Sequence, residues 1–290
     1  MPKLSGYGPL FVLSIIWGLA FVAIRTADFE LSPVNLTLLR WLIVSASFIV
    51  IYPFVIKPKV RFELHDLPRL AVVSLGNVVI YHLALNTAEK TVSASLAGFL
   101  VSLGPLFLVL LSGAVLHERI TGRLWVGLGV ALFGALVISS PDLTLQGATF
   151  LGPTLVVISA VAYAVYTVAS KPLAAKYGPF PTAAWSAFLG TLMLLPLVSP
   201  SLPAQVESLS LIGWSSVLYL AILSTVLTNL IYFTQVIGQP VSRLGVQLYL
   251  VPVVSAVGGI LILGEGVNIA TVVGGGLMLL GIAVATSSKK

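Results

Sequence analysis

The sequence predicts an all-α integral membrane protein in which ten transmembrane helices form two inverted repeats of five, with both termini in the cytoplasm. Three observations predict this fold: an extreme composition, a regular series of apolar segments, and an internal repeat. Hydrophobic residues make up 58% of the chain and charged residues only 8%, whereas about 25% of the residues of an ordinary soluble domain are charged. A soluble chain of this length could not cover its surface with so few charged residues. We therefore predict that the lipid bilayer surrounds most of the protein.

The charge and cysteine content exclude several kinds of function. The net charge is +6, but the basic residues are scattered through short connections and form no stripe that would bind nucleic acid. There is no cysteine, so a disulfide framework, a thiolate nucleophile and a thiolate metal site are excluded. We predict no catalytic residue, no metal and no cofactor.

Apolar segments of about 20 residues, the length that crosses a bilayer, recur along the whole chain. Prolines such as Pro33, Pro179 and Pro240 stand at their boundaries, because proline lacks an N–H and disfavours a helical residue before it. The first segment is too long for the apolar core of a signal peptide and is interpreted as a transmembrane helix. The predicted helices cover residues 8–25, 33–54, 67–86, 91–116, 122–140, 151–170, 180–198, 211–233, 241–263 and 268–286.

The distribution of Lys and Arg predicts the orientation. If the N-terminus is cytoplasmic, 12 of these residues lie on the inside, whereas the outside holds only Arg25 and Lys90. Cytoplasmic loops carry an excess of Lys and Arg, so both termini are expected in the cytoplasm. The plasma membrane is the expected location.

An internal repeat divides the chain into predicted halves of residues 1–145 and 146–290. At an offset of 147 residues, Pro105 aligns with Pro252 and Glu118 with Glu265. Each half holds five predicted helices, and an odd number means that the second half enters the membrane in the opposite orientation. Inverted repeats build transporters, because two such bundles can rock around a site near the middle of the membrane.

Several stretches are typical of one transporter family. They are IIWGLAFVAIR in the first predicted helix, SPVNLTLLRW opening the second, SLAGFLVSLGPLFLVLLSGAVLHERITG and VGLGVALFGALVI closing the first half, and RLGVQLYLVPVVSAVGGILILGEGVN and VVGGGLMLLGIAV closing the second. On these stretches the whole chain resembles the EamA-type branch of the drug/metabolite transporter superfamily. The resemblance implies a secondary transporter working by alternating access, with helices of both repeats around a central cavity.

Polar and aromatic residues at helical spacing are the candidates for a substrate site, because polar groups inside a membrane helix are costly and tend to face the bundle interior. Their alternative role is to hold helices together by hydrogen bonds. Together they suit a small zwitterionic or weakly polar solute with some apolar body. The predicted site residues are Trp17, Asn77, Tyr81, His82, Tyr163, Tyr166, Asn229, Tyr232, Gln247 and Tyr249.

The charged residues near the membrane are interpreted separately. Arg40 lies in the second predicted helix and is expected to snorkel outward or to bind loop carbonyls or the carboxylates of Asp28 or Glu30, with a substrate carboxylate as the alternative partner. No acidic residue falls clearly inside a predicted helix. This favours a facilitator, or coupling through His82, over a carboxylate relay, with Glu89 at a helix boundary as the residue to watch.

The two glutamates related by the repeat are interpreted as helix-turn or gate residues. Glu118 lies in the stretch VLHERITGRLW, and Glu265 stands at the equivalent position in the second half. A carboxylate there can accept free N–H groups at a helix start and is favoured by the helix dipole. Thr121 and Asn268 are the matching N-cap candidates.

Four glycines are expected to mark a close approach of helices. Gly127 and Gly134 in the first half, and Gly274 and Gly281 in the second, lie seven residues apart on one helix face. Small residues at this spacing allow membrane helices to pack with their backbones close together.

The function predicted from all these features is the transport, by export, of amino acids or related small metabolites. Sugars, nucleotide-sugars or drugs are the alternative substrates, a membrane-embedded enzyme acting on lipid phosphates is an alternative of another class, and a receptor or assembly subunit is a third. The predicted partners are a small-molecule substrate and the lipid bilayer, with no nucleic acid, in a monomer or a homodimer.

Overall fold

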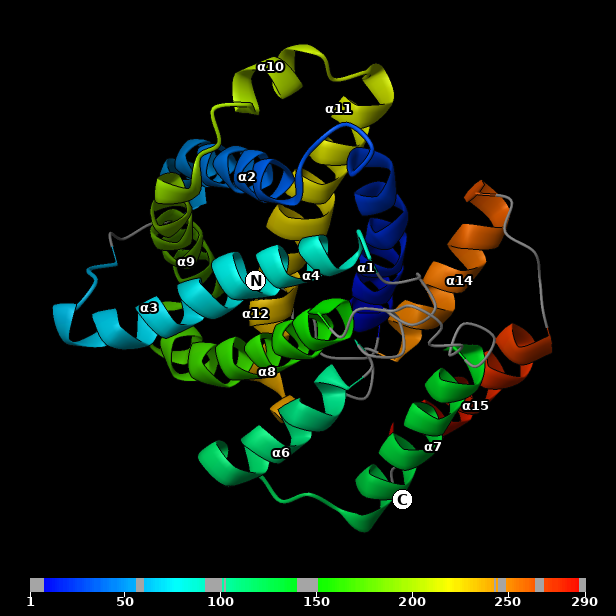
Figure 1. Cartoon of the computed structure of the whole chain (residues 1–290). Coiled ribbons are helices and arrows are strands. Elements are labelled where there is room, and N and C mark those ends of the chain that lie inside the picture. The colour runs from blue at the N-terminus through cyan, green and yellow to red at the C-terminus, as the bar shows by residue number, and fades with distance from the viewer. Residues whose placement is uncertain are drawn as a thin grey trace.

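The computed structural model describes residues 8–55, 60–91, 101, 103–139, 151–242, 244, 249–263 and 269–286, and these residues form helices and connections without any strand. The helices are α1 (Gly8–Ala27), α2 (Pro33–Val55), α3 (Leu67–Ser74), α4 (His82–Ala88), α6 (Gly104–Leu116), α7 (Gly122–Ser139), α8 (Leu151–Tyr177), α9 (Pro179–Leu194), α10 (Leu202–Glu207), α11 (Leu211–Leu218), α12 (Thr228–Gly238), α14 (Leu250–Leu263) and α15 (Ile269–Thr286) (Figure 1). The predicted all-α class is therefore confirmed over the described residues.

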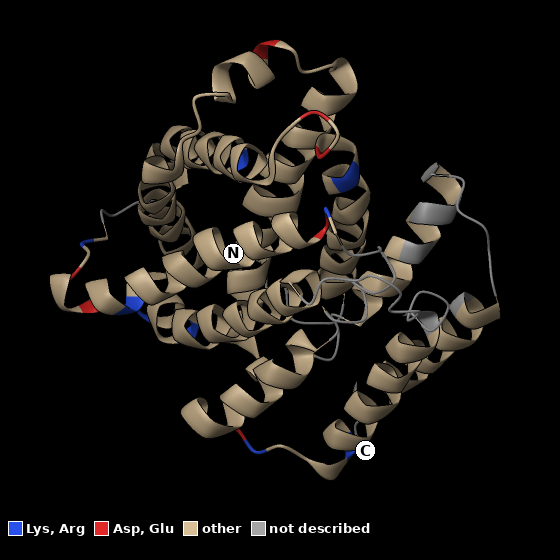
Figure 2. Ribbon diagram, in the orientation of Figure 1, with Lys and Arg blue, Asp and Glu red and all other residues tan. Residues whose placement is uncertain are grey.

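Six helical spans of the described residues are long and apolar enough to cross a membrane, as expected for a multi-pass membrane protein. They cover Gly8–Ala27, Pro33–Val55, Leu64–Ala88, Leu151–Tyr177, Pro179–Leu197 and Leu211–Gly238. Acidic and basic residues lie mostly at helix ends and in connections (Figure 2). Large apolar side chains are exposed on the outer faces, for example Phe54 and Leu261, each 78% exposed, as a protein surrounded by lipid requires.

Two helix boundaries differ from the prediction. The helix predicted to end at residue 170 continues as α8 to Tyr177 and contains Pro172. Proline inside a helix removes one backbone hydrogen bond, a loss that a packed membrane helix can tolerate. Gly178, at a φ of 92°, then reverses the chain into α9, and this left-handed conformation favours glycine. The predicted end at residue 233 is also too early, since α12 reaches Gly238.

Two long helices each contain a π-helical segment that the sequence analysis did not predict. η2 (Leu75–Tyr81) joins α3 to α4, and η5 (Tyr219–Leu227) joins α11 to α12. Backbone bonds in a π-helix run over five residues, and such segments are frequent at functional sites. The two segments occupy the third long helix of each predicted half.

The helix contacts occur in pairs that relate the two predicted halves. α1 packs against α14, and α8 packs against α6. α2 packs against η5, and α9 packs against η2. In each pair, a contact between two helices is repeated by the helices at the equivalent positions of the other half. The arrangement therefore has an approximate two-fold relation.

α7 and α15 form the most extensive helix pair and lie beside the rest of the bundle (Figure 1). A Cβ atom on Gly134 would lie 2.6 Å from the carbonyl oxygen of Gly274, and one on Gly281 would lie 2.6 Å from that of Gly127. Because the first glycine of each helix meets the second of the other, the helices are antiparallel. The predicted close approach is confirmed.

Candidate functional site

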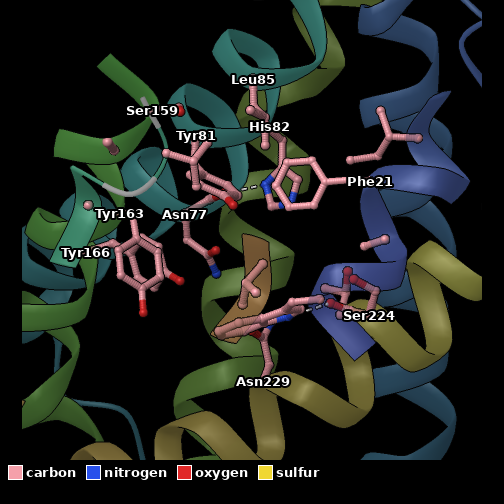
Figure 3. Close-up of a pocket in the computed structure, with 18 of the residues that line it drawn as sticks. Phe21, Asn77, Tyr81, His82, Leu85, Ser159, Tyr163, Tyr166, Ser224 and Asn229 are labelled. Carbon is pink, nitrogen blue, oxygen red and sulfur yellow. Dashed lines mark hydrogen bonds between the residues drawn. The ribbon is translucent and has the colours of Figure 1, made fainter. Parts of the chain in front are cut away.

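A cavity lies among α1, α2, η2, α4, α6, α8, η5, α12 and α14. Its empty space measures about 940 Å³, open solvent included. Tyr163 and Tyr166 from α8 face it from one side, and Phe21 and Ser224 face it from the other (Figure 3). The described residues that line it are Trp17, Ala20, Phe21, Ile24, Arg40, Asn77, Tyr81, His82, Leu85, Val101, Gly104, Pro105, Ser159, Ala160, Tyr163, Tyr166, Ser224, Thr225, Asn229, Val251 and Pro252.

The two π-helices position polar groups on the cavity wall. His82 Nδ1 lies 2.7 Å from the carbonyl oxygen of Asn77, five residues earlier, and Thr225 Oγ1 donates over the same separation to Leu220 O at 2.7 Å. A carbonyl only accepts, so Nδ1 of His82 carries a proton, and Nε2 is the acceptor of the neutral ring. In both halves, a side chain thus bonds a backbone carbonyl five residues before it.

Aromatic side chains form a connected group at one side of the cavity. The hydroxyl groups of Tyr163 and Tyr232 share a short hydrogen bond, and Thr167 Oγ1 lies 3.0 Å from the Tyr232 hydroxyl. The ring of Trp17 packs 5.4 Å from that of Tyr232, and its Nε1 donates to Thr228 Oγ1 at 3.1 Å. These bonds satisfy buried polar atoms and fix the rings that a solute would meet.

The Arg40 side chain reaches the cavity and is buried, with 5% of its surface exposed. Its Nε donates to Thr225 Oγ1 at 2.8 Å. The interpretation that Arg40 snorkels outward or binds carbonyls and carboxylates of the Asp28–Glu30 loop is therefore wrong. The physical reason is that η5 supplies buried neutral acceptors closer than the helix end.

Glu118 joins the connection after α6 to α8 and to residues 241 and 242. Its Oε1 accepts from Lys171 Nζ on α8 and from the N–H of Val241, both at 2.8 Å. Its Oε2 accepts from the N–H of Ser242 at 3.0 Å and from Ser242 Oγ at 2.9 Å. Residues 241 and 242 begin a helical segment after Pro240, so Glu118 binds free N–H groups at a helix start, as predicted, but at a helix 123 residues away.

His117 directs Glu118 toward these partners. It ends α6 in a left-handed conformation with a φ of 53°, and the N–H of Glu118 bonds back to Ser112 O at 3.3 Å. This is the geometry that reverses a chain at a helix C-terminus. Thr121 accepts from the N–H of Leu124 at 3.4 Å and caps α7, as predicted. Glu265 and Asn268 lie outside the described residues.

Comparison with known proteins decides the family. The sequence profile described as the EamA-like transporter family matches residues 4–140 and 150–287. The chain belongs to the EamA-like transporter family. This membership confirms the resemblance drawn from the sequence and the expectation that the protein is a membrane transporter rather than an enzyme.

Relatives of this EamA-like transporter match it almost from end to end. An uncharacterized transporter of Archaeoglobus fulgidus is 35% identical, over 94% of this chain and 95% of that protein. A protein of Streptantibioticus cattleyicolor named as a probable terminal-alkyne amino-acid exporter is 33% identical, over 97% and 93%. One of Escherichia coli named as a probable amino-acid metabolite efflux pump is 26% identical, over 98% and 95%. A solved crystal structure has the same fold, with a TM-score of 0.75, 23% identity, and coverage of 96% and 95%.

The structure of the EamA-like transporter brings most of the predicted site residues together. Tyr232 is not itself a lining residue, but its hydroxyl group bonds to that of Tyr163, which lines the cavity. Tyr249 is not among the residues that line the cavity, because it is buried in an apolar cluster with residues of α6, α7 and α15. Gln247 lies outside the described residues. The predicted residues that line the cavity are Trp17, Asn77, Tyr81, His82, Tyr163, Tyr166 and Asn229.

The predicted site did not include Phe21 or Ser224, which line the wall, and the prediction gave Arg40 a substrate carboxylate only as its alternative partner. Phe21 and Ser224 stand at ordinary positions in apolar helices, and no spacing rule distinguishes them. Arg40 carried a usable signal, since a cation about two turns inside a membrane helix is rare and usually functional.

Two carboxyl groups lie near each other at the end of α1 and α4, outside the membrane-spanning helices. Lys90 donates to the backbone oxygen of Asp28 and pairs with its Oδ1 at 3.9 Å. Burial raises the pKa of Asp28 to about 6, against the opposing charge of Lys90. Burial and then the Asp28 charge raise the pKa of Glu89 to about 8, against Arg25 and Arg40. Both groups are therefore easier to protonate than in the unfolded chain.

This pair predicts that stability falls as the pH rises. A carboxyl group with a raised pKa stabilises the folded state below its unfolded value, which is 3.8 for Asp and 4.5 for Glu, and this contribution is lost as the pH rises through about 6 and about 8. We expect the melting temperature in detergent to decline between pH 5 and about 9. Glu89→Gln should flatten this decline. An equally steep decline in Glu89→Gln would contradict the prediction, and Glu207→Gln, at an exposed position, is the control.

Among the described residues, one group has the spacing of a metal site: Glu63, His65 and Asp66. Lys176 Nζ already bridges the two carboxylates, at 2.8 Å from Glu63 Oε2 and 2.8 Å from Asp66 Oδ2. Tyr177 donates to the same Asp66 oxygen at 2.6 Å. The arrangement anchors the start of α3 to the end of α8, with the one ammonium group shared by the two carboxylates.

Proposed function

We propose that this protein exports amino acids or related small solutes by alternating access, and that the solute binds in the cavity described above. The observation that carries the proposal is the composition of the cavity wall. It combines aromatic rings with neutral hydrogen-bonding groups and is contributed by helices of both predicted halves. Such a wall can satisfy a small polar head and enclose an apolar body.

The architecture that we propose is ten transmembrane helices in two inverted halves, residues 1–145 and 146–290. The exchanged pairs of helix contacts and the antiparallel packing of α7 on α15 support it. Termini in the cytoplasm and a location in the plasma membrane remain part of the proposal, on the distribution of Lys and Arg.

The amino-acid substrate class is supported by two relatives. One is named as an amino-acid exporter and the other as an amino-acid metabolite efflux pump. The names suggest both the class of solute and the outward direction for this chain.

Reconstitution into liposomes tests the proposal. The flux of labelled amino acids, sugars and cationic drugs is measured with and without a pH gradient, against protein-free liposomes. We expect amino-acid flux that Asn229→Leu, which replaces a polar amide of the cavity wall with an apolar side chain, lowers at least about tenfold. Ser215→Leu on the exposed face of α11 is the matched control. Flux of sugars or drugs alone would contradict the substrate class, full flux in Asn229→Leu would contradict the site, and no flux of any solute would contradict transport.

A further inference from the structure

Arg40 is the one charged side chain among the described residues of the cavity wall. Its Nε bonds to Thr225, and its Nη2 lies 3.5 Å from both the carbonyl oxygen and the hydroxyl oxygen of Ser224. All these partners are neutral. The guanidinium has five N–H donors, so this set leaves donor capacity for a ligand.

No carboxylate of the described residues lies within 4.0 Å of Arg40. Glu89 is therefore not an ion-pair partner of Arg40. A buried cation with neutral partners retains much of the cost of its desolvation. An anion that entered the cavity would offset this cost, and a second cation would add to it.

Two further residues of the cavity wall hold donors without partners. The Nδ2 atoms of Asn77 and Asn229 are buried and have no hydrogen-bond partner in the described part of the chain. The amide of Asn77 points toward the middle of the cavity (Figure 3). No Asp or Glu is found among the lining residues. The described wall therefore has unused donors and no anionic acceptor.

Most of the remaining wall is apolar or aromatic. Phe21, Leu85 and Val251 contribute apolar surface, and Trp17 and Tyr166 contribute rings. An acid with a compact apolar or aromatic body would place its carboxylate on the donors and its body on this surface. For an amino acid, the ammonium group could be received by the neutral oxygens and by ring faces.

We propose that Arg40 binds the carboxylate of the transported solute, so that the protein selects small monocarboxylates with an apolar body, amino acids among them, over their amides and amines. This inference rests on the proposed function, because it names the chemistry by which the same cavity recognises its substrate. Arg40 is then a specificity-determining residue on the first half of the chain. Its hydroxyl partners come from η5 in the second half.

Binding to the wild-type protein tests the inference without any variant. The probes are leucine with leucinamide and 3-methylbutylamine, and phenylalanine with phenethylamine, measured by thermal shift in detergent. A ligand that binds only the folded state raises the melting temperature. We expect the two acids to raise it and the amide and amines to leave it unchanged. Equal shifts for an acid and its amide, or larger shifts for the amines, would overturn the inference.

Variants then locate the selectivity. Arg40→Gln should weaken binding and flux of the acids at least about tenfold, the loss expected for a charge-assisted bond, and should remove the preference for acid over amide. Arg40→Lys should keep part of that preference. Arg69→Gln, which removes one exposed cation from α3, is the control and should behave as the wild type. A full preference in a folded Arg40→Gln would overturn the role of this residue.

The outcomes separate this inference from the proposed function. Flux of amino acids and of their amides at equal rates leaves the transport function standing and overturns the carboxylate site. Absence of flux for every member of the panel overturns both.

Discussion

Glu118→Ala is expected to lower the free energy of unfolding by about 3 kcal/mol or more. The change leaves the N–H groups of Val241 and Ser242 and the ammonium of Lys171 without their carboxylate, and a buried polar group without a partner costs about 1–3 kcal/mol. The measurement is the melting temperature and urea midpoint in detergent at pH 7. We also expect altered flux, because the bonds join the first half of the chain to the second at one end of the bundle.

The control for this prediction separates the helix start from the ion pair. Glu118→Gln keeps an oxygen for the N–H groups but loses the charge, so its effect should be intermediate. Lys171→Met removes only the cation, whose side chain is 27% exposed, and should cost less than Glu118→Ala. If Glu118→Ala and Lys171→Met cost the same, the bonds to residues 241 and 242 contribute nothing and the prediction fails.

The pH dependence of this contribution has the opposite sign to that of Asp28 and Glu89. Burial alone would raise the pKa of Glu118, but the Lys171 ammonium and the Ser242 and Val241 donors outweigh it and hold the pKa below 4.5. The stabilisation is therefore present above 4.5 and lost as the pH falls through the lowered value. The stability of the wild type should therefore be greatest between the acidic pH range in which Glu118 is protonated and the higher pH range in which Asp28 and Glu89 lose their protons.

The position of Glu118 indicates what local sequence can predict. Its charge, its place after a long apolar helix and its repeat partner predicted a carboxylate at a helix start. The helix that it caps is not the next one but the one that begins at Val241. No periodicity links positions 123 residues apart, so the partner depends on how the two halves pack.

The helix cores were predicted well because the bilayer sets their length and composition. The end of α8 was not, because the helix was predicted to stop at residue 170 and instead continues through Pro172 to Tyr177. The π-helices were not predicted either. One extra residue in a helical turn leaves the hydropathy unchanged and is identified only from its hydrogen bonds, such as that of Thr225 to Leu220.

The sequence predicted part of the site, because helical spacing shows which residues share a helix face but not which helix that face meets. Helical spacing placed Asn77 and Tyr81 on one face, and both lie on the cavity wall. Tyr249 satisfied the same rule but is buried against α7 and α15, because spacing defines a face and not the neighbour that it meets. Arg40 was assigned to the membrane surface because the hydroxyl groups that hold it come from a distant π-helix.

Gly134→Leu is expected to lower the free energy of unfolding by at least about 3 kcal/mol, the upper range for overpacking. Its first added atom would already lie 2.6 Å from Gly274 O and 2.8 Å from the backbone nitrogen of Met278. Backbone atoms in helices cannot move aside as a flexible side chain can, so α7 and α15 would have to separate. The loss is measured as thermal unfolding in detergent, and as the fraction of protein that elutes as a single species.

The same helix supplies a control of identical chemistry. Gly129 is exposed, and a Cβ atom there would meet nothing within 4 Å. Gly129→Leu should therefore be neutral or stabilising by up to about 1 kcal/mol, since leucine is the better helix former. Gly276→Leu is the corresponding control on α15, where a Cβ atom also meets nothing within 4 Å. Equal losses for Gly129→Leu and Gly134→Leu would mean that a general effect of leucine, and not the close contact of the two halves, determines stability here.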